Sequence, residues 1–279
     1  MSGRFALIAL DIDGTLLGSD RRVSERNRAA ARAALAAGIR LVLVTGRRQP
    51  AARGIAEELG PDIPLVLHNG ALIVEAGRVI RCRPLAVDAA RDAVRAGRAA
   101  GADPVVHCGT NGEGRLLVAR VSRSNTLLAY YLDKAHPDVT VVDDLEAALP
   151  EDPIQVMFGG GTEAIAALEP SLRGLLGARA RLERTVYPAR GVALLDVIDP
   201  TVSKAEAVAF LEARWGLAPS ATLAIGDNWN DREMLEHAGL GLVMGNAEPA
   251  MRALGLPTVP RNDEDGVAVA IERHVLARC

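Results

Sequence analysis

The chain has little cysteine, a small net charge and no long apolar run. Three cysteines, Cys82, Cys108 and Cys279, stand among 279 residues, and none belongs to a Cys-x-x-Cys pair. An odd number of unpaired cysteines disfavours both a disulfide framework and a structural zinc site. The net charge of -3 gives no reason to expect nucleic acid or an anionic membrane as a partner.

Apolar runs are short and broken by charge or glycine, and none approaches the ~18 residues of a membrane span. Too few apolar residues precede Asp11 for a signal peptide, and a cleavage site is lacking. We therefore expect a cytoplasmic protein, either a monomer or a homodimer. Its residues are 49% hydrophobic and 24% charged, which suffices for the buried core of one large or two ordinary domains.

Strand and helix patterns alternate over the first 83 residues. Strands are expected at 5–10, 39–44 and 65–67, and helices at 25–37 and 50–59. Ser24 is a suitable N-cap for the first helix, and Gly38 and Gly60 end the two helices. Strand–helix–strand spacing of this kind requires parallel pairing through right-handed crossovers. The expected fold class is α/β, with a doubly wound, mostly parallel sheet.

The pattern changes after Pro84. A helix at 87–100 precedes short strand candidates at 104–107, 115–120, 139–142 and 154–158, with helices at 125–135 and 163–176 among them. Short strands separated by turns and helices predict an inserted α+β domain. Doubly wound character returns with the apolar run 192–198. We therefore expect a core made of 1–83 and 190–279, interrupted by an insert at 84–189.

Polar clusters follow the predicted core strands or open a core helix. They are Asp11 with Asp13, Thr45 with Gly46, Lys204, and Asp227 with Asp231. Ligands of an open parallel sheet bind outside the carboxyl ends of its strands, so these clusters are expected along one rim. Asp11 and Asp13 would repel each other unless a cation or a phosphoryl group lay between them. Carboxylate oxygens with retained waters suit Mg²⁺.

Phosphoryl transfer is a reaction that uses such a set. Its transition state spreads negative charge over oxygens that a cation and a lysine can stabilise. One aspartate can attack phosphorus, while another protonates the leaving oxygen and later activates water. Each part also has a plainer interpretation. Lys204 can be a structural ion pair, Thr45-Gly46 a helix entry, and Asn69-Gly70 a two-residue hairpin turn, which its spacing favours.

Together the clusters resemble the four ordered motifs of the haloacid dehalogenase (HAD) superfamily of phosphatases. The matching segments are Asp11-Ile-Asp-Gly-Thr-Leu, Thr45-Gly-Arg, Lys204 and Gly226-Asp-Asn-Trp-Asn-Asp. His68-Asn69-Gly70-Ala71, Val202-Ser203-Lys204 and Val243-Met244-Gly245-Asn246-Ala247 are similar to segments of its Cof-type branch. The resemblance covers residues 5–83 and about 190–275, and it implies that the insert is a large α/β cap that selects substrates.

The resemblance also implies a role for each matching residue. Asp11 would be the nucleophile and a metal ligand, and Asp13 the acid/base, with its main-chain carbonyl as a second ligand. Lys204 would neutralise the phosphate, Thr45, Gly46, Asn69 and Asn230 would contact it, Arg47 would face the substrate, and Asp227 and Asp231 would complete the Mg²⁺ site. One departure is that Thr201 and Ala205 stand where branch members often carry glycines around the lysine.

We therefore expect an Mg²⁺-dependent phosphatase that hydrolyses a small phosphorylated metabolite, such as a sugar phosphate, through an aspartyl-phosphate. A phosphotransferase or phosphomutase on the same scaffold is the nearest alternative. A receiver-type phospho-accepting module is more remote, because receivers are one small domain and carry their acids on different strands. A P-loop kinase is excluded because Gly-x-x-x-x-Gly-Lys-Ser/Thr is missing.

Overall fold

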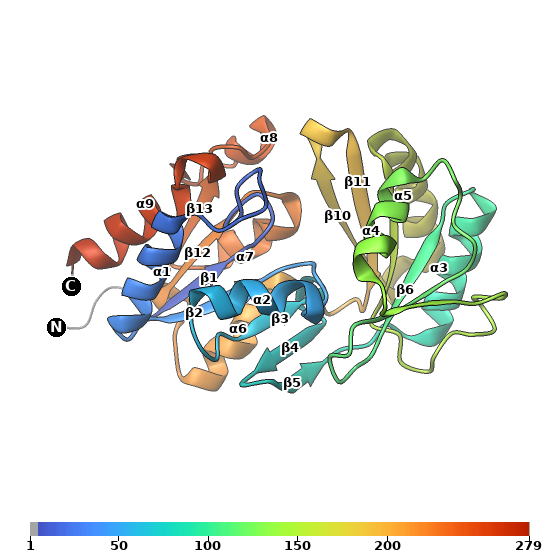
Figure 1. Ribbon diagram of the computed structural model, residues 1–279, viewed down its shortest axis with the longest axis horizontal. Coiled ribbons are helices and arrows are strands. Elements are labelled where there is room, and N and C mark those ends of the chain that lie inside the picture. Colours follow the sequence, from blue (N-terminus) through green and yellow to red (C-terminus); the bar gives the residue numbers. More distant parts are fainter. Residues whose placement is uncertain (1–4, 279) are drawn as a thin grey trace. The chain divides into compact units, whose positions relative to one another are not determined.

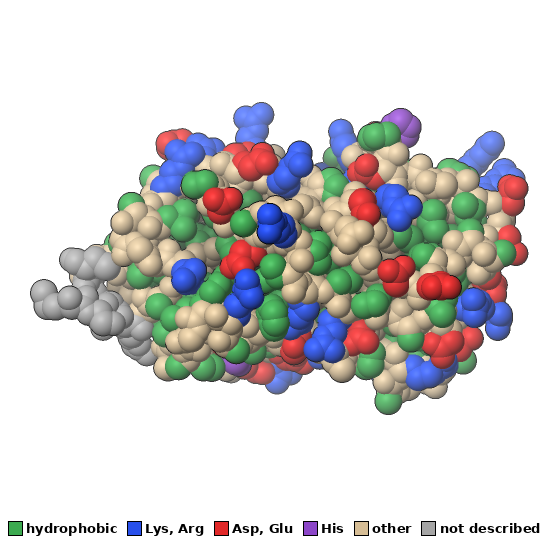
Figure 2. Space-filling model, turned by 90° about the horizontal axis from the view of Figure 1, so that it is seen from below, with side chains coloured by type: hydrophobic (Ala, Val, Ile, Leu, Met, Phe, Trp, Pro, Cys, Tyr) green, Lys and Arg blue, Asp and Glu red, His purple; other side chains and the backbone are tan. Residues whose placement is uncertain are grey.

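The computed structural model describes residues 5–278, which form two compact units. One unit contains the chain up to Ile80 and from Ser203 onward, and the other contains Arg81–Val202. Residues 1–4 and Cys279 lie outside the described part, whereas Cys82 and Cys108 are free. Within residues 5–278, no helix has the length and apolar character needed to cross a membrane. Acidic and basic side chains are mixed over the face that Figure 2 shows.

The first unit is built on an eight-stranded sheet. Its strands, in order, are β14 (Thr258–Val259), β13 (Leu240–Met244), β12 (Thr222–Gly226), β1 (Leu7–Leu10), β2 (Arg40–Val44), β3 (Leu65–Leu67), β4 (Leu72–Glu75) and β5 (Arg78–Cys82). Pairing is parallel from β14 to β3, and β4 then pairs antiparallel with β3. The predicted doubly wound, mostly parallel sheet is therefore confirmed.

Helices cover both faces of this sheet (Figure 1). They are α1 (Glu25–Ala36), α2 (Gln49–Leu59), α6 (Lys204–Trp215), α7 (Arg232–His237), α8 (Pro249–Arg252) and α9 (Gly266–His274). Alternate strand residues, such as Leu7 and Val42, pack against α6 and α7 through Val208 and Met234. The α1 and α9 helices contact each other, and the buried Asn27 side chain of α1 accepts a hydrogen bond from the Ala268 amide at 2.9 Å.

The second unit has its own six-stranded sheet. Its order is β10 (Arg181–Tyr187), β11 (Val192–Ile198), β9 (Gln155–Gly161), β6 (Pro104–Cys108), β7 (Arg115–Val118) and β8 (Val139–Val141). Its helices are α3 (Val87–Ala99), α4 (Thr126–Ala135) and α5 (Thr162–Leu176). The α3 and α5 helices share a core with Val106 and Phe158 on one face of the sheet. On the other face, Leu128 of α4 packs with Val105 and Met157.

The sequence-based boundary at residue 190 is wrong. β11 pairs antiparallel with β9 and with β10, so it belongs to the sheet of the second unit and not to the core. An apolar run indicates a buried strand but does not reveal which sheet receives it. β10 was missed altogether, because only Leu182 and Val186 of its seven residues are buried and its other side chains are mostly polar.

Candidate active site

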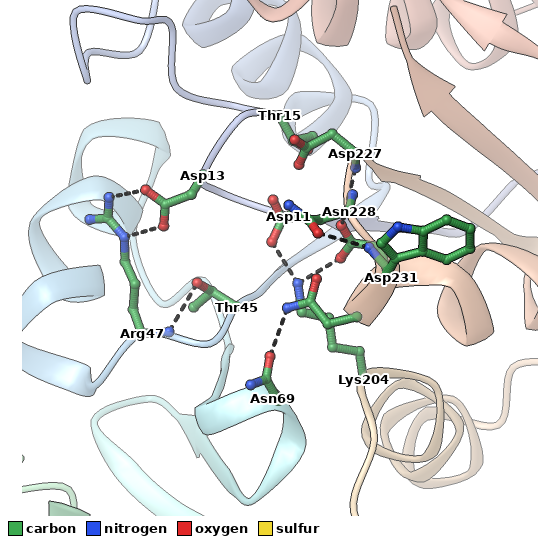
Figure 3. Close-up of polar contacts among 12 residues, drawn as sticks. Asp11, Asp13, Thr15, Thr45, Arg47, Asn69, Lys204, Asp227, Asn228 and Asp231 are labelled. Atoms are coloured by element: carbon green, nitrogen blue, oxygen red, sulfur yellow. Dashed lines mark hydrogen bonds and ion pairs between the residues drawn. The ribbon is translucent and has the colours of Figure 1, made fainter. Parts of the chain in front are cut away.

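Four chain segments bring the site residues together at the carboxyl ends of the central strands of the first unit (Figure 3). Asp11 follows β1 directly, Thr45 follows β2, and Asp227 follows β12. β1 lies between β2 and β12, and both pairings are parallel, so the three strands end on the same rim. The fourth segment is the start of α6, where Ser203 is the N-cap and Lys204 is the first helical residue.

Glycine allows the turn after Asp13 to approach Asp227 closely. Gly14 has φ of +83°, and a Cβ atom added there would lie 2.3 Å from Oδ2 of Asp227. Any side chain would therefore clash with a carboxylate and would also strain the backbone. The next residue, Thr15, donates a hydrogen bond from Oγ1 to Oδ1 of Asp227 at 3.1 Å. The Asp-Gly-Thr sequence thus places and orients the carboxylate of a distant strand.

Lys204 is a buried cation held by two carboxylates. Its Nζ lies 2.6 Å from Oδ1 of Asp11 and 2.6 Å from Oδ1 of Asp231. Only 1% of the lysine is exposed, and 0% of Asp231. Oδ2 of Asp231 accepts the backbone amides of Asp227 and Asn228 at 3.1 and 3.0 Å. Both oxygens of Asp231 are therefore in use, which favours a role in placing Lys204 and the loop after β12.

Three carboxylates form an acidic cluster around this lysine. Asp11, Asp227 and Asp231 each offer an oxygen atom, and these atoms lie within 4.8 Å of one another. Asp227 is the most accessible of the three, since Asp11 and Asp231 are buried. When all three carboxylates are ionised, one ammonium leaves two negative charges uncompensated at the cluster. Hard oxygen donors with this excess charge fit a divalent cation such as Mg²⁺.

The pKa values reflect the crowding of charge. Burial, followed by the carboxylate of Asp231, raises the pKa of Asp11 to about 7 despite the opposing effect of Lys204. Burial and the neighbouring carboxylates also raise the pKa of Asp227 well above its ordinary value. Burial alone would lower the pKa of Lys204, but Asp11 and Asp231 outweigh it and raise that pKa. A bound cation would favour the ionised carboxylates, because it supplies the missing positive charge.

Asp13 points away from this cluster and binds Arg47. The guanidinium donates from Nε to Oδ2 and from Nη2 to Oδ1 of Asp13, both at 2.6 Å. The side chain of Asp13 is not one of the three clustered carboxylates. The sequence-based expectation that Arg47 faces the substrate did not foresee this pairing, because the two residues are 34 positions apart and neither motif implies the other.

The residues expected to contact phosphate lie on three neighbouring segments. Thr45 is 1% exposed, and its Oγ1 accepts the backbone amide of Arg47 at 3.2 Å. A Cβ atom added to Gly46 would lie 3.2 Å from Oδ1 of Asn69. That oxygen accepts a hydrogen bond from Nδ2 of Asn230 at 2.9 Å. Thr45, Gly46, Asn69 and Asn230 are thus brought together from three segments.

The Asn69-Gly70 hairpin is confirmed, although its turn is longer than two residues. β3 and β4 pair antiparallel with Leu67 opposite Leu72, so four residues form the connection. His68 and Asn69 have φ of 51° and 55°, a left-handed conformation that asparagine tolerates better than most residues. Asn69 is 1% exposed and directed at Asn230, so the turn also serves the site.

Two asparagines that the sequence analysis did not assign hold the loop after Asp13. Nδ2 of Asn246 donates to the carbonyl of Gly14 at 2.8 Å, and its Oδ1 accepts the amide of Asn262 at 2.9 Å. The side chain of Asn262 in turn donates to the carbonyl of Leu17 at 2.9 Å. The Met-Gly-Asn-Ala segment was the available signal, because it marks a polar residue at the end of β13.

The parallel sheet with carboxylates at its strand ends makes the chain an α/β protein with a polar site on the rim of its sheet. The family model of haloacid dehalogenase-like hydrolases matches residues 8–271. The chain therefore belongs to the haloacid dehalogenase-like hydrolases, which confirms the family resemblance of its motifs.

Relatives of known name include phosphatases. The chain is 29% identical to the HMP-PP phosphatase of Serratia proteamaculans over 251 residues, 90% of this chain and 87% of the relative. It is 28% identical to the 5-amino-6-(5-phospho-D-ribitylamino)uracil phosphatase YbjI of Escherichia coli, over 96% of this chain and 95% of that one. Both relatives are named as phosphatases, and each match covers most of both chains.

Another relative is much longer. The chain is 28% identical to the chloroplastic endoribonuclease YBEY of Arabidopsis thaliana, but it spans only 47% of that protein. The name of the longer protein therefore assigns no ribonuclease activity to the matched part. Among solved structures, a haloacid dehalogenase-like hydrolase from Bacteroides thetaiotaomicron superposes with a TM-score of 0.81 at 25% identity, over 96% of this chain and 99% of that one.

Proposed function

We propose that the chain is a divalent-cation-dependent phosphatase that hydrolyses small phosphorylated metabolites through an aspartyl-phosphate on Asp11. The observation that carries this proposal is the position of Asp11. Its carboxylate is buried at a strand end, is bonded to Lys204 at 2.6 Å and belongs to a cluster with two uncompensated negative charges. A phosphoryl dianion would be repelled by this negative charge, so the site needs a divalent cation that offsets the charge before the substrate binds.

Asp11 is the best-placed nucleophile. Its oxygen attacks phosphorus and forms a P–O bond, while the bond from phosphorus to the leaving oxygen breaks. Lys204 stabilises the negative charge on the transferring group, and a cation held by Asp11 and Asp227 would supply further positive charge there. The hydroxyl of Thr45 and the amide of Gly46 hold its other oxygens. Asp231 acts through Lys204, because it bonds the ammonium at 2.6 Å.

Asp13 acts at the leaving oxygen. In its protonated form it is a general acid that donates its proton to that oxygen when the P–O bond breaks, which leaves a neutral alcohol and the Asp13 carboxylate. As a base it then accepts a proton from the water that attacks phosphorus. This second step restores the carboxylate of Asp11 and releases inorganic phosphate. A phosphotransferase differs only in that a second alcohol replaces this water.

Substrate selection is assigned to the second unit, on the basis of a polar sheet cluster that we define as His107, Gln155, Arg181, Glu183 and Asp196. Paired registers place these residues on the same sheet face as Met157, opposite the apolar core of α3 and α5. Nε2 of Gln155 donates to Oδ1 of Asp196 at 2.9 Å, and Arg181 pairs with Glu183.

Burying polar side chains lowers the stability of a sheet face that elsewhere packs against apolar residues of α4. Gln155 and Asp196 are 1% and 3% exposed, and buried polar groups cost stability unless they are hydrogen-bonded. A carboxylate and an amide together recognise hydroxyl and N–H donors. The proposed substrates are therefore phosphate monoesters whose leaving groups carry such donors, as polyols and nitrogen heterocycles do.

Phosphate release tests the proposed function. We expect hydrolysis of a generic aryl phosphate with Mg²⁺, its loss in EDTA and its recovery when Mg²⁺ is restored. A panel of sugar, polyol and heterocyclic phosphates then identifies the substrate class. Addition of a competing alcohol separates the alternatives, since a phosphotransferase would form a new phosphate ester. Release that EDTA leaves unchanged would contradict the proposal.

A further inference from the structure

We propose that Arg47 is a positioning residue for Asp13, and that it acts on the reaction through that carboxylate rather than through contact with the phosphoryl group. This inference rests on the proposed function, in which Asp13 transfers the proton. The central observation is the two-bond contact between the guanidinium and the carboxylate, with both bonds 2.6 Å long. Only arginine has a planar fork that can make this contact.

Arg47 is itself anchored at its other end. Nη1 donates to the carbonyl of Ala51 at 2.9 Å, and the backbone amide donates to Oγ1 of Thr45 at 3.2 Å. Ala51 lies in the first turn of α2, so the guanidinium is tied to a helix as well as to Asp13. Each of its three nitrogen atoms thus has a named partner within the first unit. An arginine anchored in this way can hold the carboxylate of Asp13 in one orientation.

Asp13 needs a partner of this kind. Only Ile12 separates it from Asp11, and the acidic cluster already carries two uncompensated negative charges. A third excess charge would favour conformations that turn the Asp13 side chain farther away or leave it mobile in solvent. The fork of Arg47 compensates this charge and fixes the plane of the carboxylate. The side chains remain 25% and 34% exposed, which leaves the pair accessible at the edge of the site.

The geometry also argues against a direct contact between Arg47 and phosphate. Nε and Nη2 point at Asp13, and Nη1 points at Ala51. Binding phosphate through this guanidinium would require breaking at least one of these bonds. Lys204 already supplies a buried cation beside Asp11.

Leaving-group dependence provides the test. We would measure single-turnover release of the leaving group for an alkyl phosphate and for p-nitrophenyl phosphate. An alkoxide needs a proton as it departs, whereas p-nitrophenolate does not. We expect R47Q to slow the alkyl phosphate on the order of 100-fold, the lower end for loss of a general acid. Release of p-nitrophenolate should fall less than about threefold. R47K should resemble R47Q, because it keeps the charge but loses the fork.

A double-mutant cycle with D13N decides between the two roles. If Arg47 acts through Asp13, R47Q should change the D13N enzyme less than about twofold, since coupled residues are not additive. R53Q is the matched control, because Arg53 lies on α2, the helix that follows Arg47, is 71% exposed and pairs only loosely with Glu57 at 3.4 Å. A cooperative thermal unfolding transition of each variant establishes that it is folded. If R47Q does not unfold cooperatively, R47K replaces it in the cycle.

Two results would overturn the inference. One is an equal loss on both substrates in R47Q that persists in the D13N background, with a raised KM and rescue by R47K, which would make Arg47 a phosphate ligand. The other is no loss on either substrate. A wild-type enzyme without phosphatase activity would instead refute the proposed function, and the inference with it.

Discussion

The two units bury polar residues in different places. In the first unit, charged residues lie beyond the ends of parallel strands, where Asp11, Asp227 and Lys204 converge from distant segments. In the second, polar residues lie within the strands, at alternate positions of one sheet face, as with Gln155 and Asp196. Parallel strands gather groups at a rim and suit a small, highly charged reacting centre. A sheet face spreads its groups out and suits contact with a broader part of a molecule.

This difference explains what the sequence could predict. Asp11, Asp13 and Gly14 are adjacent in the chain, so the chemistry of the rim is visible as a short motif. Their approach to Asp227 requires parallel pairing through β1 and β12, which the apolar runs indicated. Even so, the partner of Asp13 was missed, because the bond to Arg47 depends on side-chain direction and not on order in the chain.

Residues of the polar sheet cluster leave no comparable motif. Gln155 and Asp196 are 41 positions apart, and they meet only because β9 and β11 pair in one particular register. His107 is 2% exposed, and its ring stacks on Tyr131 with centroids 6.2 Å apart. Without the register, the alternate polar residues of β10 resemble a solvated strand face, and Asp196 is a single polar residue in the apolar run of β11.

The largest expected effect is at the rim. Asp11→Asn keeps the shape of the side chain but removes the proposed nucleophile and a proposed cation ligand, so phosphate release should fall by more than about 10⁴-fold. The melting transition should stay cooperative, because the change removes one of three crowded carboxylates. Glu57→Gln on the exposed face of α2 is the matched control. An Asp11→Asn protein with wild-type phosphate release would refute the assignment.

Next in size is the dependence on the cation. Asp227→Ala removes the most accessible carboxylate of the cluster and leaves Asp11 and Lys204 in place. We expect the Mg²⁺ concentration for half-maximal activity to rise at least about tenfold, with partial recovery at high Mg²⁺. A titration of activity against Mg²⁺ measures this. An unchanged half-saturation point would place the cation elsewhere.

A smaller and more selective effect is expected in the second unit. Asp196→Asn should lower kcat/KM for the best metabolite about 10–100-fold, since it removes a charged hydrogen-bond acceptor. Hydrolysis of p-nitrophenyl phosphate should change less than about threefold. Glu169→Gln is the control, because Glu169 pairs with Arg173 on α5, on the opposite side of the sheet. Equal losses on both substrates would remove the distinction between the two units.

The smallest effect is expected for Asn246, which supports the loop after Asp13. Asn246→Ala removes the hydrogen bonds to Gly14 and Asn262, and the free energy of unfolding should fall by about 1–3 kcal/mol. Asn246→Asp keeps the acceptor for Asn262 but loses the donor to Gly14, so it should recover part of the stability. Denaturant titration measures both variants. If turnover falls about 100-fold or more in Asn246→Ala, the asparagine has a catalytic role beyond support of the loop.

The most direct test of the account is to look for a phosphoryl group on Asp11. An enzyme sample in turnover with Mg²⁺ and substrate would be quenched rapidly in acid, digested and examined by mass spectrometry. We predict one phosphoryl group on the peptide that contains Asp11. It should accumulate in Asp13→Asn supplied with p-nitrophenyl phosphate, because the base for its hydrolysis is missing, and it should be absent from Asp11→Asn. Steady turnover with no phosphorylated peptide, or with the group on another residue, would contradict Asp11 as the nucleophile.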